Sequence, residues 1–375
     1  MPRDWPELLQ IATGRTNDVR YRAMTLPRHL GPLLSYWWYS APKRHDRISA
    51  AYAEIIARAA PEHDDMISEA GAFALVRRDG FRALFREQAA FDAEVAAAEV
   101  LRVAHGAKFS VLTPQELKQA EPGLRDAGLG GLHWLESWTV SDPGALVEAY
   151  AGLFERMGGT IVRADAASLS ERNGTWSIAG PDGSIDAEAA VVALGPWSPD
   201  LLKTLGYRFP MVRKRGYHRH YAGGGGLDLP LRDVAGGYVI APMRKGLRIT
   251  TGAELAFPDD KPEPVQLARA EQAAREIIDL GCPVEAEPWF GTRPCMPVAG
   301  LGNCAAPRGA VDAFRARPPG FYAGAGDRAH PGRVNERRDT ERGPVGLPTR
   351  SFRGLSGSGV GRRHLCEDTK TLVRD

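Results

Sequence analysis

A short apolar run that ends on a glycine is the feature that most limits how this chain can fold. Residues 189–198 read AAVVALGPWS, and the small apolar part of this run predicts a strand buried on both faces. The run stops at Gly195, just before SPDLL begins a helix. In dinucleotide-binding α/β domains, a glycine at such a strand end lets the backbone approach the pyrophosphate closely. The alternative interpretation is an ordinary turn.

The segments on the N-terminal side of this run favour the first interpretation. Asp142-Pro143 can begin a helix and Gly158-Gly159 can end it. Two β segments follow, TIVRADAASLS and GTWSIAGPDGSIDAEAAVVALG, and Pro181-Asp182-Gly183 is predicted as a hairpin turn within the second. The order of helix, glycine pair, β-meander, buried strand and glycine fits the later half of a dinucleotide-binding domain.

The rest of the chain divides into three regions of different character. Residues 7–105 carry apolar residues at helical spacing, and residues 208–256 are rich in β-forming patterns. A helix in VQLARAEQAAREIIDLG leads to PWFGTRPCMP. From residue 301 onward there is no Ile, Met or Trp, and Arg outnumbers Lys 13 to 1. We expect no packed core in this last region.

Composition excludes several classes of function. The 375 residues are 43% hydrophobic, enough for one large or two ordinary domains. A formal charge of +2 gives no reason to expect nucleic acid as a partner. The four cysteines show no metal-ligand spacing, so no metal site is predicted. There is no apolar run of membrane-spanning length and no signal-peptide apolar region, which predicts a cytoplasmic protein.

Several motifs give the chain a family resemblance. VVALGPWSPDLL, VRKRGYHRHY, GGYVIAPMRKGLRITTGAEL and PWFGTRPCMP stand in the order seen in FAD-dependent D-amino-acid dehydrogenases, which belong to the glycine/D-amino-acid oxidase superfamily. YWWYSAPKRH, LTPQELKQAEPGL and VSDPGALVEAY are similar too, so the resemblance covers residues 1–297. It implies a mixed α/β (α+β) fold in which an FAD-binding, Rossmann-like domain is interwoven with a mixed-sheet substrate domain.

The resemblance also implies an activity. An enzyme of this kind oxidises a D-amino acid, its small-molecule substrate, to an imino acid that water hydrolyses to a 2-oxo acid and ammonia, with FAD as hydride acceptor. A dehydrogenase passes the electrons to a membrane quinone, which implies peripheral contact with the inner membrane face, whereas an oxidase passes them to dioxygen. Two alternatives stay open: a flavin amine oxidase acting on glycine, sarcosine or hydroxyproline, and an inactive remnant.

Two residues are predicted to bind the substrate. Arg293 in FGTRP matches the family's Gly-x-Arg-Pro motif, whose arginine meets the substrate carboxylate; a surface arginine before a proline is the alternative. Tyr238 in GGYVIAP matches an aromatic position that faces the substrate, although a half-buried strand tyrosine explains it nearly as well. No general base is predicted.

The resemblance places two short segments beside FAD. The first is KRGYH, where related enzymes run their chain past the flavin ring, and it contains Gly216, Tyr217 and His218. The second is the glycine turn at the end of the apolar run, which contains Gly195, Pro196 and Trp197. Its tryptophan is expected to pack beneath the cofactor.

The chain departs from the family at both ends. No GxGxxG unit follows a strand and opens a helix, and the similar run at 324–329 is followed by Pro331, which prevents the helix. Without that unit the phosphates lose a helix N-terminus, so we expect an incomplete FAD domain and weak or absent FAD binding. A gene fragment, a misplaced start codon or an upstream frameshift would explain the difference.

A second frameshift is predicted near residue 300. Synonymous codons can be chosen for residues 309–335 so that reading from one nucleotide earlier gives GALWMHFGHGHQGFTLGPATGRILAE and then a stop codon. This shifted peptide resembles the family's closing segment. The predicted domains are therefore 1–143, mainly helical and part of the substrate domain; 144–207, part of the FAD-binding domain; 208–297, the mixed-sheet substrate domain; and 298–375, an aberrant and disordered tail.

Overall fold

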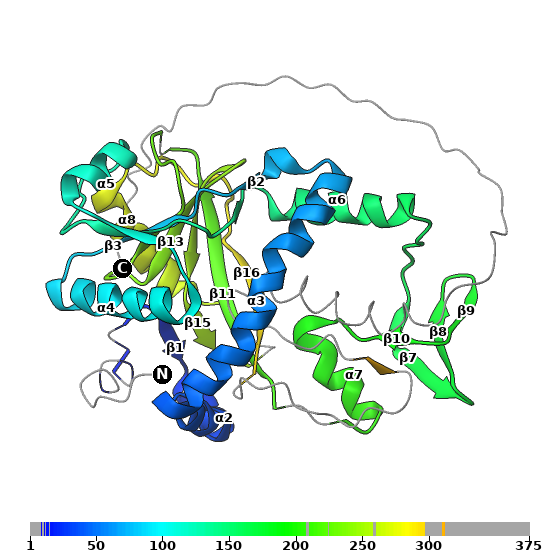
Figure 1. Cartoon of the computed structure of the whole chain (residues 1–375). Coiled ribbons are helices and arrows are strands. Elements are labelled where there is room, and N and C mark those ends of the chain that lie inside the picture. Colours follow the sequence, from blue (N-terminus) through cyan, green and yellow to red (C-terminus); the bar gives the residue numbers. More distant parts are fainter. Residues whose placement is uncertain are drawn as a thin grey trace, which may run out of the picture. The chain divides into compact units, whose positions relative to one another are not determined.

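A ten-stranded mixed sheet is the largest feature of the computed structural model (Figure 1). The structure describes residues 16–207, 210–223, 225–257 and 260–296, a few residues before 16, and the backbone of 310–311. All of these belong to one unit, residues 1–331.

The strand order of this sheet mixes distant parts of the chain. It runs β1-β15-β11-β14-β13-β12-β3-β5-β4, and β16 also pairs with β11. Most pairs are antiparallel, but β1 runs parallel to β15 and β12 runs parallel to β3. The strands are β1 (Val19–Tyr21), β3 (Phe81–Leu84), β4 (Phe109–Leu112), β5 (Gly131–Trp134), β11 (Val212–Tyr221), β12 (Leu231–Asp233), β13 (Tyr238–Met243), β14 (Gly246–Thr251), β15 (Ala253–Leu255) and β16 (Trp289–Cys295).

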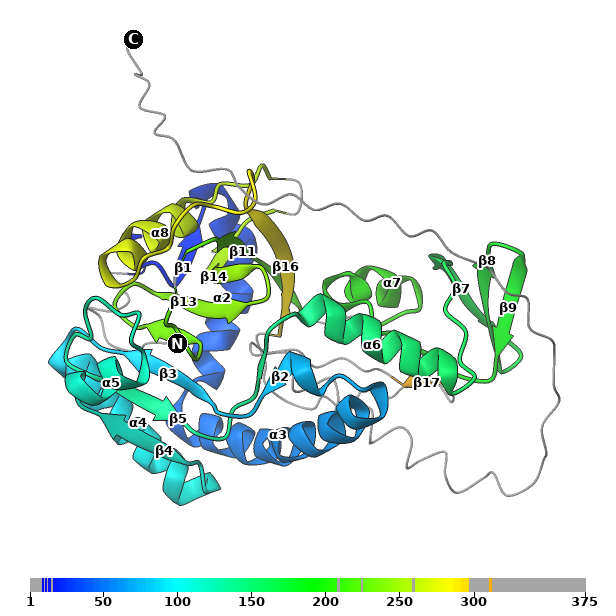
Figure 2. The same ribbon diagram turned by 90° about the horizontal axis from the view of Figure 1, so that it is seen from above.

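One face of the sheet is covered by α8 (Val265–Ile277), which lies beside β11, β13 and β14 in Figure 2. The helix predicted in this segment is confirmed, and its apolar stripe is buried, because Leu267, Ala270 and Ala274 are at most 2% exposed. These side chains pack against inward-facing strand residues, including Tyr217, Tyr221, Tyr238, Ile240 and Ile249. This cluster is the main hydrophobic core.

The expected helix-rich region contains α2 (Leu26–Tyr39), α3 (Pro42–Ala70) and α4 (Gln88–His105). α5 (Pro114–Ala120) begins with a capping box in which Thr113 and Glu116 bond each other's backbone. α3 packs against α6 (Pro143–Arg156) near the two-residue pair of β2 (Val76–Arg77) and β6 (Thr139–Val140). Short 3₁₀ turns complete the region: η1 (Ala23–Thr25) and η2 (Phe73–Leu75).

The predicted start and end of α6 are confirmed. Asp142 caps the helix, because its Oδ1 accepts a hydrogen bond from the Ala145 N–H at 3.1 Å. Pro143 occupies the first turn. Gly158, just past the end, has φ +91°, a backbone conformation that favours glycine.

The residues after α6 form a three-stranded meander and a short strand. The meander contains β7 (Asp165–Arg172), β8 (Thr175–Gly180) and β9 (Gly183–Ala187). The predicted hairpin is confirmed, since Gly180 pairs with Gly183 around a tight turn. β10 (Ala190–Val191) runs parallel to β17 (Ala310–Val311), and η3 (Gly195–Trp197) and α7 (Ser198–Thr204) follow β10.

The strand expected over residues 189–194 is shorter and less buried than predicted. β10 has only two residues, and Val191 is 56% exposed although Val192 is buried. Among the described residues, β17 is the one strand that pairs with β10, and the exposure of Val191 shows that one face of the apolar run is not buried.

Most of the tail predicted over 298–375 lies outside the described residues, apart from β17. The frameshift and the disorder of this tail therefore stay predictions. In the part of the chain that the structure describes, no helix is both long enough and apolar enough to cross a membrane.

Candidate active site

The pairing of β11 with β16 brings most of the predicted site residues together. Lys214 lies opposite Arg293, Gly216 opposite Gly291, and His218 opposite Trp289. Because side chains alternate across a strand, these positions share one face of the sheet. We call this face, opposite α8, the site face; it also carries His220 of β11 and Arg248 and Thr250 of β14.

Arg293 lies flat against the backbone of β11. A Cβ placed on Gly216 would come within 2.5 Å of Nη2 and 2.6 Å of Cζ of Arg293, so only glycine leaves space for the guanidinium there. Burial lowers the pKa of Arg293. Within the described residues, no carboxylate lies at ion-pair distance from Arg293. A desolvated arginine without an anion is a binding site for one.

The fit between Arg293 and Gly216 gives a testable prediction. We expect Gly216→Ala to fold, because the Arg293 side chain can move, but to displace its guanidinium and weaken carboxylate binding about tenfold or more. Calorimetric titration with a carboxylate ligand measures the loss. Unchanged affinity in the variant would contradict the assigned position of Arg293.

His218 is held as a neutral imidazole on the site face. Its ring stacks on Trp289, with centroids 4.4 Å apart and planes inclined by 26°. Burial is the main cause that lowers the pKa of His218 to about 4, and the nearby cations Arg248 and Arg293 lower it further. At neutral pH His218 therefore adds no charge to this face.

The pKa of His218 predicts a pH dependence of stability. Because its folded pKa lies below the unfolded value of about 6.5, protonation favours the unfolded chain. The stabilisation is complete above pH 6.5 and is lost as the pH falls toward 4. We expect the stability difference between the wild type and His218→Gln to shrink over this window. Urea unfolding at several pH values measures it, and a pH-independent difference would contradict the neutral assignment.

The two predicted tyrosines lie on the other face of the sheet, away from Arg293. Tyr217 is 1% exposed, and its hydroxyl hydrogen-bonds Glu254. Tyr238 is 2% exposed, and its hydroxyl donates to Asp233 at 2.8 Å. The structure therefore does not bring Tyr238 together with Arg293, and we leave both tyrosines out of the candidate site.

The backbone conformation of the glycine turn itself requires a glycine at position 195. Gly195 has φ +56°, and no atom of the described residues lies within 4 Å of a Cβ placed on it, so the conformation needs glycine while these residues leave the space beside it open. Pro196 is buried, and its carbonyl accepts a hydrogen bond from Arg213 Nε at 2.8 Å, which ties η3 to β11. Trp197 is 61% exposed, so within the described residues it is not packed in the core.

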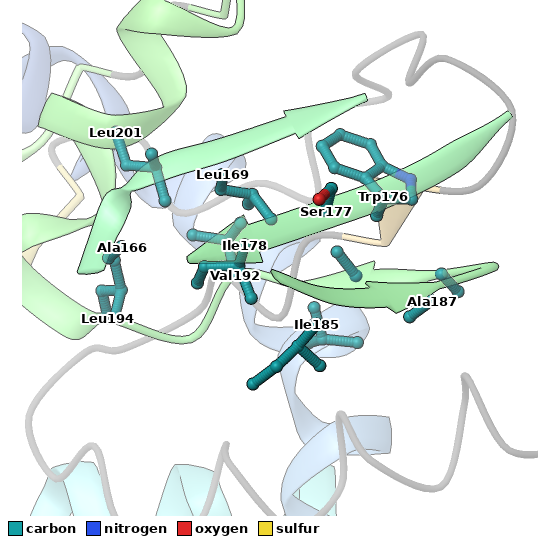
Figure 3. A pocket seen from close by; sticks show the side chains of 13 residues that line it. Ala166, Leu169, Trp176, Ser177, Ile178, Ile185, Ala187, Val192, Leu194 and Leu201 are labelled. Atoms are coloured by element: carbon teal, nitrogen blue, oxygen red, sulfur yellow. The ribbon is translucent and has the colours of Figure 1, made fainter. Parts of the chain in front are cut away.

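A cavity of about 240 Å³ lies between the meander, β10 and α7 (Figure 3). Its lining is apolar except for Ser177, and it includes Trp176, Ile178 and Leu201. None of the described residues that line it is a cation, so they do not offer the charges that a diphosphate needs.

Comparison with known proteins identifies the family. The sequence pattern of the family described as "FAD dependent oxidoreductase" (DAO) matches residues 28–331. The chain belongs to this family. It is 28% identical over 329 residues to the D-amino-acid oxidase of Bradyrhizobium diazoefficiens, covering 84% of this chain and 76% of that protein. It is 35% identical over 243 residues to a D-amino acid dehydrogenase of Cereibacter sphaeroides, covering 59% of this chain and 52% of that protein.

The fold agrees with the family assignment. Glycine oxidase from Geobacillus kaustophilus superposes with a TM-score of 0.62 at 19% sequence identity, and the match covers 80% of this chain and 81% of that one. The mixed α/β fold expected from the sequence is thereby confirmed. The chain spans about half the length of the dehydrogenases that it matches.

The DAO family is FAD-dependent, and the described residues fit one part of that cofactor. The open space beside Gly195, next to the exposed side chains of Leu194 and Trp197, suits the approach of a flat aromatic ring. The apolar cavity in Figure 3 does not suit the diphosphate. We therefore assign no described residue to the diphosphate.

Sequence reasoning missed Arg248, a polar residue of the site face. Arg248 donates from Nε to His220 Nε2 at 2.9 Å, and His220 Nδ1 lies 2.6 Å from Glu285 Oε1. Arg248 belongs to the alternating pattern of GLRITT, which shows that its side chain lies on the other face of β14 from those of Leu247 and Ile249. The sequence does not show that β14 brings it next to His220.

Proposed function

We propose that this chain carries out FAD-dependent oxidative deamination of D-amino acids, with Arg293 as the anchor of the substrate carboxylate. The observation that carries the proposal is that Arg293 is half-buried on the site face and, within the described residues, has no carboxylate partner. The names of the D-amino-acid oxidase and dehydrogenase relatives support it.

The chain's own residues have separate tasks in this proposal. The guanidinium fork of Arg293 donates two parallel hydrogen bonds to the carboxylate and so fixes the orientation of the substrate Cα. Gly216 leaves the space in which that fork lies. His218 stays neutral and neither repels the substrate ammonium nor competes for the carboxylate. FAD, when bound, supplies the acceptor for the hydride that leaves Cα.

The products follow from the bonds that change. The amine loses a proton to water and Cα loses a hydride, which gives the imino acid. Water then adds to the imine carbon and ammonia leaves, which yields the 2-oxo acid. Residues 144–207 belong, in this proposal, to the FAD-binding domain, and residues 1–143 and 208–297 to the substrate domain. The electrons pass on to a membrane quinone, with peripheral contact at the inner membrane face.

A turnover screen with added FAD tests the proposal. We expect 2-oxo acid and ammonia from D-amino acids with an artificial quinone acceptor, and little from the L-enantiomers, glycine, sarcosine or hydroxyproline. Hydrogen peroxide formed at the rate of substrate oxidation would overturn the choice of a quinone. Turnover of N-methyl amino acids alone would overturn the substrate class. The flavin absorbance of the purified chain measures the weak FAD binding expected from the sequence.

A further inference from the structure

We propose that Arg248 forms a second carboxylate subsite on the site face, so that the preferred substrates are amino acids with an acidic side chain. This inference rests on the proposed function, because it takes Arg293 as the anchor of the α-carboxylate. It concerns residues of β11 and β14 that the deamination itself does not require.

A part-buried hydrogen-bond network around the buried His220 fixes the direction of Arg248. Arg248 Nε can only donate, so His220 Nε2 must accept, and the ring proton is on Nδ1. That proton is donated to Glu285 Oε1 at 2.6 Å, while Glu285 Oε2 accepts the His220 backbone N–H at 2.9 Å. His220 is 3% exposed, so the relay is built into the sheet. His220 and Glu285 are positioning residues for Arg248.

Among the described residues, Arg248 is linked to one carboxylate, Glu285, through His220 and pairs with none directly. Burial lowers the pKa of its guanidinium, and among the described residues no carboxylate lies within ion-pair distance of it. The nearby Asp142 is engaged at the N-terminus of α6, where it accepts from Ala145 N. With Nε already bonded to His220, the two terminal nitrogens of Arg248 present a fork that suits a carboxylate.

The spacing of the two arginines suits a short dicarboxylate. Arg293 lies over Gly216 and Arg248 lies beside His220, and the Cα atoms of Gly216 and His220, four residues apart on β11, are about 13 Å apart. A guanidinium–carboxylate contact takes up roughly 4 Å at each end. About 5 Å remains, the distance between the carboxyl carbons of an extended five-carbon dicarboxylate. Only the neutral ring of His218 lies between them on that strand face.

Glutarate and its monoamide test the subsite without any turnover, because neither carries an oxidisable amine. In calorimetric titrations of the full chain we expect glutarate to bind at least tenfold more tightly than the monoamide. Arg248→Gln should bring this ratio close to one, and Arg248→Lys should restore part of it. The exposed Arg244→Gln, in the same hairpin, is the matched control and should leave the ratio unchanged.

The outcomes separate the two proposals. Equal binding of the two ligands by the wild type, or a ratio that Arg248→Gln leaves unchanged, would overturn the second subsite alone. If Arg293→Gln left the affinity for the monoamide unchanged, the proposed function would fail, because Arg293 would not be the shared anchor. Thermal unfolding of each variant shows whether it is folded. If Arg248→Gln does not fold, the ratio measured for Arg248→Lys decides whether Arg248 forms the second subsite.

Discussion

Replacing Arg293 by Gln should cost the protein most of its affinity for amino-acid carboxylates. A carboxylate bound by a buried arginine fork loses about 3 kcal/mol when the charge is removed, which corresponds to a loss of about 100-fold or more in affinity. Arg293 can supply this much because it is half-buried, which removes part of its hydration, and, within the described residues, no internal carboxylate neutralises it. The dissociation constant of a 2-oxo acid or a simple carboxylate measures the effect.

Arg293→Lys separates charge from geometry. Lysine keeps the positive charge but not the planar fork, so we expect it to recover only part of the lost affinity. Lys214→Gln is the matched control, because Lys214 lies directly opposite Arg293 on the site face but has its ammonium over the ring of Tyr36. If Lys214→Gln lost as much carboxylate affinity as Arg293→Gln, the summed positive charge of the site face would bind the carboxylate. That result would contradict Arg293 as a specific anchor.

Glu121→Ala should be among the most destabilising single substitutions in the chain. Glu121 is fully buried, forms an ion pair with Arg82 of β3, and accepts the backbone N–H groups of Asp228 and Leu229 ahead of β12. Its removal leaves the nearly buried guanidinium of Arg82 uncompensated and two N–H groups without their acceptor. Loss of one partner of a buried pair costs about 3–5 kcal/mol.

Urea unfolding of Glu121→Ala measures this cost. Glu99→Ala is the control, because it breaks an exposed pair with Arg102 on α4 and should leave the unfolding midpoint nearly unchanged. If Glu121→Ala unfolded at the same urea concentration as Glu99→Ala, the buried pair would not hold α5 to the sheet.

Local signals in the sequence predicted those parts of the fold that depend on neighbouring residues. Asp142-Pro143 and the glycine pair after α6 predicted where this helix begins and ends, because capping and positive φ are properties of a few adjacent residues. The hairpin at Gly183 and the helix α8 followed for the same reason. Arg293 was found through its motif, and its environment on the site face supports that assignment.

Features that depend on strand register could not be predicted. In YVIAPM both alternating sets of residues are largely apolar, so the pattern does not reveal that Tyr238 faces the core and Val239 the other side. The same holds for Arg248, which meets His220 only because Arg248 and His220 are paired across two strands. The apolar run before Gly195 predicted burial, but whether a strand is covered depends on its neighbours, not on its own composition.

The position of a bound carboxylate tests the central claim most directly. A crystal structure of the chain with a substrate-like carboxylate, such as D-lactate, would locate that group without any requirement for turnover. We expect both carboxylate oxygens at hydrogen-bond distance from the Arg293 guanidinium, above Gly216 and beside the stacked rings of His218 and Trp289. A carboxylate bound elsewhere, with Arg293 paired to an internal acid, would contradict the account.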